Sequence, residues 1–215
     1  MAKSIHVDLE NFVVSVREDG VEVRRIDDCS FGRHDGDPSD LTPTPFDSVL
    51  PLNNRHVHYR NDQNSPMPFS LFFDEPHDGC AFHWGNTFVE SHGCVHLSRE
   101  DAEWLYRWAG GPPFSDPQPV ALRIRGQHPL SGTRVYKRDT ATGMGPSVIL
   151  KINTVLHAAG HLAREPDANF DAGTEAAVMA FQRAQHFDEA DVDGKVGLQT
   201  AMAMKIASDP ELPIP

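Results

Sequence analysis

A cysteine between histidines is the feature of this sequence with the clearest capacity for chemistry. Cys94 follows Ser91-His92-Gly93, and His83 lies a short distance upstream. A free cysteine is usually a small buried residue. A thiol with imidazoles nearby and a flexible glycine beside it is instead typical of a nucleophile. We therefore predict that Cys94 is a catalytic nucleophile.

Acyl transfer through a cysteine requires a base for the thiol and donors for the oxyanion. A neighbouring imidazolium would also lower the pKa of the thiol. His83 and His92 compete for the role of base, with His96 a weaker third candidate. His92 belongs to the same turn as the cysteine, so its ring can support the turn instead of touching sulfur. We favour His83, which arrives from a separate strand, and expect Gly93 to let backbone amides approach the substrate.

Composition indicates a globular protein with room for one large domain, or for one medium and one small domain. The 215 residues are 39% hydrophobic and 23% charged. The excess of 31 acidic over 19 basic residues gives a net charge of −12, which argues against a nucleic-acid partner. The N-terminus has no apolar signal region, and no run reaches the roughly 20 apolar residues that span a membrane. We expect no membrane insertion.

The remaining cysteines and histidines do not form a recognisable metal site. Cys29 and Cys80 are interpreted as small buried residues, although the sequence leaves open whether they pair. The other histidines are scattered, without a zinc motif. Asp191 and Asp193 suggest a calcium loop, but Lys195 occupies a ligand position. We expect no metal and no cofactor.

Hydrophobic patterning predicts a β-rich first part and a helical second part. Residues 5–25 alternate, with a hairpin at Asp19-Gly20, and residues 30–45 are typical of a long loop. Further strands are expected at residues 55–59, 69–73, 80–83 and 120–124. Ser98 and Asp101 predict the start of a helix directly after the cysteine motif.

After residue 126 the pattern changes. Residues 127–146 are typical of a linker with one short strand near Val135-Tyr136. Helical periodicity then predicts three short helices, the first over residues 148–159, the second beginning at Thr174 and the third opening at residues 196–200. We predict a catalytic domain at 1–126, a linker at 127–146 and a helical domain at 147–215.

The cysteine motif and the helix after it resemble the YkuD-type L,D-transpeptidase domain. Other segments resemble that family in the same order, over roughly residues 4–125: the strand at 5–9, Gly36 with the Thr-Pro segment at 42–45, the Met-Pro-aromatic segment at 66–69, and His83. Residues 173–178, 181–182 and 193–200 resemble a three-helix peptidoglycan-binding module. The resemblance implies a mainly β, sandwich-like catalytic domain with a short helix after the cysteine, joined to a small all-α domain.

The resemblance also assigns roles to individual residues. It implies Cys94 as nucleophile and His83 as base, with the backbone carbonyl of Trp84 holding the imidazole. The oxyanion turn and the substrate groove are each assigned to a group of residues. The turn would be shaped by Ser91, His92, Gly93 and Val95, and the substrate would be contacted by Met67, Phe69 and His96.

The implied substrate is the tetrapeptide stem of peptidoglycan, with its glycan. Cys94 would attack the L,D bond before the terminal D-Ala, and an amine or water would then resolve the acyl-enzyme. Two departures from the family leave transpeptidation, exchange and L,D-carboxypeptidase action open: His96 replaces the usual Arg or Asn, and Trp84 replaces a glycine at the start of a shortened loop. The alternative is a non-catalytic peptidoglycan-binding module. A papain-like peptidase is disfavoured because its histidine follows its cysteine.

A cell-wall substrate lies outside the cytoplasm, so the expected place of action is the periplasm or cell wall. Because no Sec signal is visible, one hypothesis is an antibacterial effector exported by a type VI secretion system. The secretion apparatus and an immunity protein would then be partners. The other explanation is a sequence that lacks its natural leader.

Overall fold

The computed structural model describes residues 2–32, 40–51, 55–74, 79–110, 119–127, 135–138, 145–207 and 209–210. The chain divides into two compact units, one of Met1–Thr133 with Asp209–Pro215 and one of Arg134–Ser208. Gly36, from the resembling glycine loop, lies outside the described residues.

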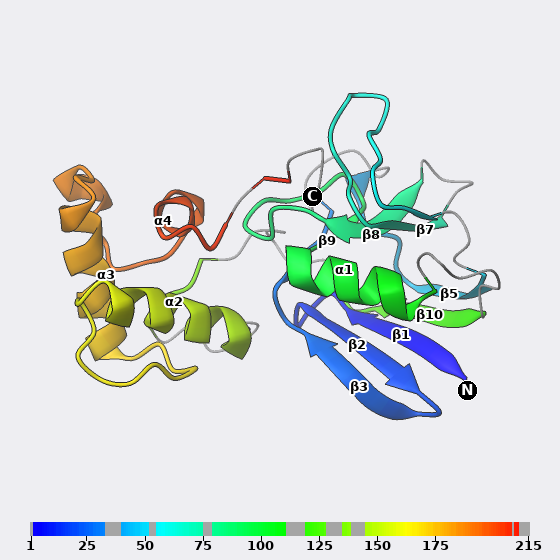
Figure 1. Ribbon diagram of the computed structural model, residues 1–215, viewed down its shortest axis with the longest axis horizontal. Helices are drawn as coiled ribbons and strands as arrows, with labels where there is room; N and C mark the ends of the chain where they lie inside the picture. Colours follow the sequence, from blue (N-terminus) through cyan, green and yellow to red (C-terminus); the bar gives the residue numbers. More distant parts are fainter. Residues whose placement is uncertain are drawn as a thin grey trace. The chain divides into compact units, whose positions relative to one another are not determined.

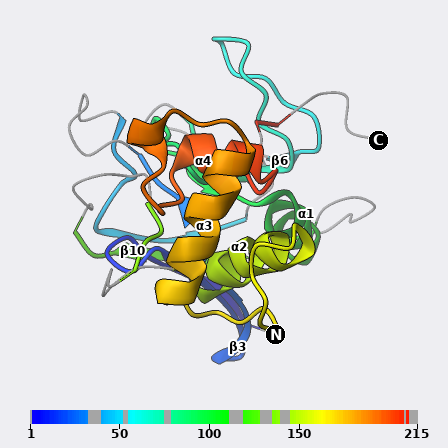
Figure 2. The ribbon, with the colours of Figure 1, turned by 90° about the vertical axis from the view of Figure 1, so that its left-hand side faces the viewer.

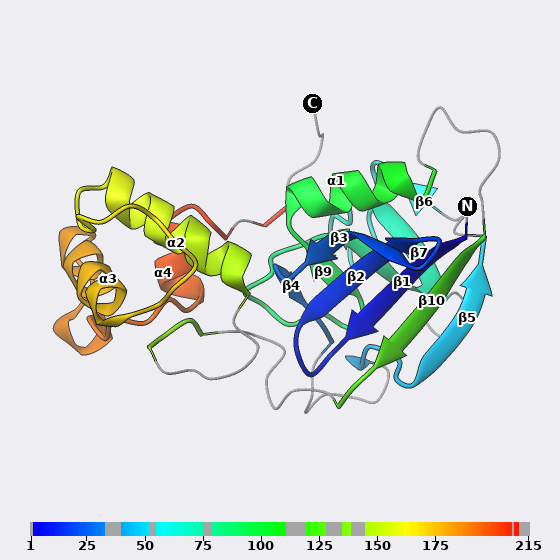
Figure 3. The same ribbon diagram turned by 90° about the horizontal axis from the view of Figure 1, so that it is seen from below.

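The first unit contains a five-stranded sheet in the order β3-β2-β1-β10-β5, seen in Figure 3. Its strands pair antiparallel, except that β1 runs parallel to β10. Asp19 and Gly20 have φ angles of 48° and 84°, which confirms the predicted hairpin between β2 and β3. The strands are β1 Lys3–Asp8, β2 Val13–Glu18, β3 Val21–Ile26, β5 Phe46–Leu50 and β10 Val120–Arg125.

A second five-stranded sheet, in the order β4-β9-β8-β7-β6, carries the cysteine motif. Here β8 and β9 run parallel, and the other neighbours are antiparallel. Figure 1 shows α1 next to this sheet, where it contacts β7, β8 and β9. The elements are β4 Cys29–Ser30, β6 Arg55–His56, β7 Ser70–Asp74, β8 Cys80–Trp84, β9 Val95–Leu97 and α1 Arg99–Trp108.

One hydrophobic core joins the two sheets and α1. Alternation along β8 sends Phe82 into this core with Leu105 of α1 and Ile5 of β1. The intervening residues of β8, Ala81 and His83, therefore face the other side of the sheet. The Ser98 hydroxyl accepts a hydrogen bond from the Asp101 amide at 3.2 Å, which confirms the predicted helix start.

The second unit consists of helices α2 Pro146–Ala158, α3 Ala172–Ala184 and α4 Leu198–Ala203, with a short 3₁₀ turn at Glu189–Asp191. Figure 2 shows this unit from the front, with α3 crossing α2. The predicted fold class, a mainly β domain followed by three helices, is confirmed. Tyr136, in the stretch expected to be a linker, is buried and exchanges two backbone hydrogen bonds with Val196 at 3.0 and 2.9 Å. Within the described residues no helix is both long and apolar enough to cross a membrane.

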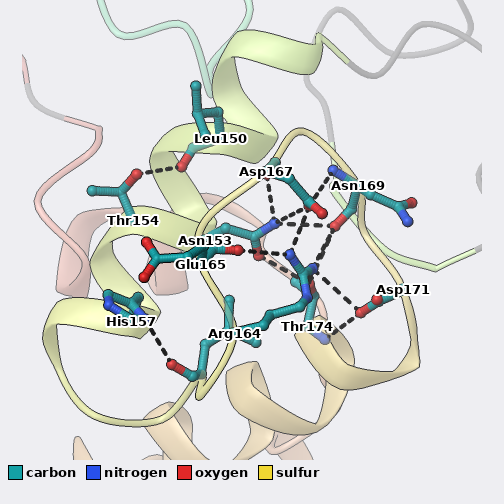
Figure 4. A network of polar contacts seen from close by, with 11 residues as sticks. Leu150, Asn153, Thr154, His157, Arg164, Glu165, Asp167, Asn169, Asp171 and Thr174 are labelled. Carbon is teal, nitrogen blue, oxygen red and sulfur yellow. Dashed lines mark hydrogen bonds and ion pairs between the residues drawn. The ribbon is translucent and has the colours of Figure 1, made fainter.

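A buried amide organises the long loop between α2 and α3 (Figure 4). Asn153, which is fully buried, donates to the backbone carbonyls of Asp167 and Asn169 at 2.7 and 3.0 Å. Its side-chain oxygen accepts from the buried Thr174 hydroxyl at 2.9 Å. The Asn153 amide thus substitutes for backbone partners that the irregular loop lacks.

Replacing Asn153 with leucine should destabilise the helical unit. The substitution conserves approximate volume but leaves the Asp167 carbonyl and other buried polar groups without this donor, which costs about 2–4 kcal/mol. Far-UV circular dichroism during urea unfolding of the full chain measures the loss. Thr154→Ala, at the exposed neighbouring position, is the control and should stay within about 0.5 kcal/mol of wild type. An unchanged midpoint for Asn153→Leu would contradict the role assigned to this amide.

Candidate active site

The parallel pair β8 and β9 brings the candidate catalytic residues together. Cys94 directly precedes β9, and the register places Phe82 opposite Val95 and His83 opposite His96. Cys94 packs against a small buried cluster on the face of the sheet away from the main core. The residues of this cluster are Met67, Phe72 and Ala81, with Tyr59 partly buried beside them. Cys94 and His83 therefore share one face of the same strand pair.

His83 is held as a neutral imidazole with one ring nitrogen available. Only 4% of the residue is exposed, and Nδ1 lies 2.8 Å from the backbone oxygen of Trp84. Because a carbonyl can only accept, Nδ1 carries the proton and Nε2 keeps its lone pair. Burial lowers the pKa of His83 to about 3, an effect that the neighbouring His96 reinforces. The contact with Trp84 is the one that the family resemblance implies.

Burial favours the neutral form of the Cys94 thiol. Burial raises its pKa to about 11, against a smaller opposing effect of the Ala81 backbone. Both Cys94 and His83 belong to the described residues, and their side chains form no hydrogen bond with each other there. Burial disfavours the charged form of both groups, so these pKa shifts do not favour the imidazolium–thiolate pair that the sequence led us to expect, and that pair stays a prediction.

The turn before the nucleophile is fixed through its backbone. Gly93 has a φ of +98°, a conformation that side chains rarely adopt. Ser91 is buried, and its amide donates to the Phe31 carbonyl at 2.9 Å. Its hydroxyl donates to the Cys94 carbonyl at 2.5 Å. The carbonyl of Gly93 accepts from the Thr42 hydroxyl at 2.9 Å, so both peptide groups that flank Cys94 are anchored.

His96 lies beside His83 in the β8–β9 register, and other groups of the protein hold its ring; the substrate contact expected of it stays a prediction. Its Nδ1 lies 3.2 Å from the Asn86 carbonyl and 3.3 Å from the Ser30 hydroxyl. Its ring meets that of His83 edge-on, with centroids 4.8 Å apart. A Cβ at Gly85 would lie 2.5 Å from the His96 ring, so the glycine makes room for the imidazole. Burial lowers the pKa of His96 to about 4.

Phe69 and Met67 were both expected to contact the substrate, but Phe69 lies in the main core, whereas Met67 lies in the cluster beside Cys94. Residues two apart on a regular strand share a face, but Phe69 has a φ of +56°. This left-handed conformation breaks the alternation, and the ring enters the main core 5.9 Å from that of Tyr106.

Three other predicted site residues take different positions. The Val95 side chain lies in the main core, so only its backbone belongs to the turn. The Trp84 ring packs against the same core, with the Arg99 guanidinium 5.4 Å from its centroid. His92 is exposed. The structure thus brings together Cys94, His83, Gly93, Ser91, Met67 and the Trp84 carbonyl.

Sequence reasoning missed the residues that hold the site from other segments. In the sequence Thr42 is only part of a Thr-Pro segment, and no pattern marks Ser30 or Asn86. Their hydroxyl and backbone groups contact the site from segments that are distant in the sequence. The only sequence feature that could have indicated such a contact was the threonine in a motif of the resembling family. Among the described residues, no cluster of three or more His, Cys, Asp or Glu side chains could hold a metal ion.

Comparison with known proteins identifies the family. Residues 2–136 match the model of the L,D-transpeptidase catalytic domain, YkuD. The chain belongs to the YkuD family of L,D-transpeptidases. In this YkuD protein, residues 147–204 match the model of a putative peptidoglycan binding domain. No curated protein matches it.

Solved structures similar to this YkuD protein include several L,D-transpeptidases. That of Stackebrandtia nassauensis is 19% identical, with a TM-score of 0.46, and the match covers 61% of this chain and 58% of that one. L,D-transpeptidase 1 of Mycobacterium tuberculosis is 18% identical, with a TM-score of 0.42, covering 58% and 62%. The enzyme of Xylanimonas cellulosilytica is 24% identical, with a TM-score of 0.39, covering 56% and 60%. The match thus spans about three fifths of the length of each.

Proposed function

We propose that this chain is a cysteine acyltransferase that cleaves the L,D bond of peptidoglycan tetrapeptide stems. Membership of the YkuD family and the peptidoglycan-binding match support a peptidoglycan substrate. Cys94 is the proposed nucleophile, His83 the proposed base, and the Ser91–Cys94 turn the proposed source of the oxyanion donor.

In the first step the Cys94 sulfur bonds to the stem carbonyl while Nε2 of His83 takes the thiol proton. Because burial favours the neutral form of both groups, proton transfer accompanies attack. The tetrahedral oxyanion accepts from backbone amides of the turn. The carbon–nitrogen bond to the terminal D-Ala then breaks, and His83 returns the proton to the leaving amine.

In the second step an amine or water attacks the thioester. His83 accepts the proton of the attacking group, the carbon–sulfur bond breaks, and the thiol is reformed. An acceptor amine from another stem gives a cross-link, a free D-amino acid gives exchange, and water gives carboxypeptidase action. The product therefore depends on which nucleophile reaches the thioester.

The observation that carries this proposal is the fixed tautomer of His83. Its hydrogen bond to the Trp84 carbonyl leaves Nε2 as an acceptor, on the face of the β8–β9 pair that also carries Cys94. A catalytic hydrogen bond that is absent before substrate binds commonly forms in the complex. The pair is therefore suited to general-base activation of a neutral thiol.

Two mass-spectrometric measurements on the wild-type protein test the proposal. Incubation with a carbapenem should give a covalent adduct, which peptide mapping places on Cys94. Incubation with purified tetrapeptide stems should release D-Ala, and the mass of the other product distinguishes tripeptide, cross-linked dimer and exchanged stem. Absence of both the adduct and D-Ala release would contradict the proposal.

The alternative is a non-catalytic peptidoglycan-binding module. The raised thiol pKa and the missing hydrogen bond between Cys94 and His83 favour it. It predicts binding to isolated cell walls without D-Ala release. Delivery as an antibacterial effector is a separate hypothesis, which periplasmic expression followed by muropeptide analysis tests.

A further inference from the structure

A buried threonine joins three backbone segments at the nucleophile turn. Thr42 is fully buried, and its hydroxyl accepts from the Gly32 amide at 3.0 Å. The same hydroxyl donates to the Gly93 carbonyl at 2.9 Å. Because the Gly32 amide can only donate, the hydroxyl proton is directed to Gly93. One hydroxyl therefore links the segment after β4 to the turn before Cys94.

The backbone is packed so closely around Gly32 that no larger residue fits there. A Cβ added at Gly32 would lie 2.1 Å from the Asp40 oxygen and 2.9 Å from the Gly93 nitrogen. Gly32 also forms an isolated parallel bridge with Ser91. The backbone of the turn is thus packed directly against the segments on either side of Thr42.

The hydrogen bond to Gly93 determines where the Cys94 amide points. The carbonyl of Gly93 and the N–H of Cys94 belong to one planar trans peptide group, in which the two bonds point in opposite directions. Holding the carbonyl toward Thr42 turns the Cys94 N–H away from it. Glycine alone would resist rotation of this peptide weakly, because its backbone is permissive. Ser91 anchors only the following peptide, through the Cys94 carbonyl.

We propose that Thr42 is a positioning residue that aims the Cys94 N–H at the oxyanion formed when the substrate carbonyl is attacked. This inference rests on the proposed acyl transfer by Cys94. Thr42 needs no contact with the substrate, since it acts through the peptide group between Gly93 and Cys94. The hydroxyl is the essential group, and the threonine methyl contributes only packing.

Thr42→Val and Thr42→Ser separate these two contributions. Valine keeps the shape without the hydroxyl, and loss of an aligned oxyanion donor should slow carbapenem acylation by about 10- to 100-fold. The turnover number for tetrapeptide stems should fall with little change in KM. Serine should restore acylation to within a few-fold of wild type. Alkylation of Cys94 by iodoacetamide, a displacement without an oxyanion, should remain within about two-fold in every variant.

The alkylation arm distinguishes positioning from general structural support. Acylation of folded Thr42→Val at the wild-type rate would overturn the inference. A parallel loss of acylation and alkylation that serine fails to restore would also overturn it. Should valine prevent folding, Thr42→Ala removes the same hydroxyl with less crowding and is judged by the same two rates. Absence of an adduct on wild-type protein would overturn the proposed function as well, whereas equal rates for wild type and valine would overturn only the role of Thr42.

Discussion

Replacing Cys94 with alanine is expected to abolish carbapenem acylation and the release of D-Ala from tetrapeptide stems. The thioester requires a sulfur nucleophile, and the other two cysteines, Cys29 and Cys80, are buried in the main core. The residual rate should fall below detection in a mass-spectrometric assay of the tripeptide product. Binding to isolated cell walls should be retained, since the peptidoglycan-binding match lies at residues 147–204.

Cys80→Ala is the matched control for this loss. Cys80 is also outside any disulfide, but it is 5% exposed and belongs to the main core. Its removal should lower stability slightly and leave acylation intact. Normal turnover by Cys94→Ala would refute the nucleophile assignment, and loss of turnover in both variants would indicate a folding defect instead.

Acid should destabilise the catalytic unit more than is usual for a protein of this size. His83 and His96 have pKa values of about 3 and about 4 in the fold, against 6.5 for an ordinary histidine. Between these values the unfolded chain binds protons that the folded chain does not, so the free energy of unfolding falls as the pH falls from about 6.5 to about 4. At about 1.4 kcal/mol per pKa unit, the combined loss is on the order of several kcal/mol.

Urea unfolding at a series of pH values measures this effect. The stability difference between neutral pH and mildly acidic pH should shrink markedly in His83→Gln, which keeps a polar side chain that cannot be protonated in this range. His92→Gln, which removes an exposed histidine of the same turn, is the control and should retain the wild-type slope. If wild type and His83→Gln lost stability equally in acid, burial would not lower the pKa of His83, and this prediction would be wrong.

Local patterns were sufficient for the strands and helices whose hydrophobic period is regular. The first three strands, their Asp19-Gly20 turn and the helix start at Ser98 were predictable for this reason. Strand β5 was missed because its alternation is misleading: Val49 points outward and is 70% exposed, while Ser48 lies on the inner side. The parallel pairing of β1 with β10 joins the two ends of the unit, and no local pattern encodes such a contact.

The residues of the candidate site also fall into two groups, those that a local motif predicts and those that depend on contacts between distant segments. Cys94, His83 and Ser91 were predictable because their motif is contiguous or close in sequence. Phe69 was misplaced because one left-handed residue reverses the alternation. The support of His96 by Asn86, and of Gly93 by Thr42, depends on segments that meet only in the fold. No local pattern indicates that Gly85 leaves room for the His96 ring beside His83, and the substrate contact expected of His96 stays a prediction.

The distribution of the three cysteines has a consequence for oxidative damage. None of the three forms a disulfide, and Cys29 and Cys80 lie in the main core, whereas Cys94 packs on the opposite face of the sheet. A sulfenic acid formed on Cys94 would therefore have no resolving thiol on its own face, and an external thiol would be needed to reduce it. Without one, further oxidation to the sulfinic acid would inactivate the protein irreversibly.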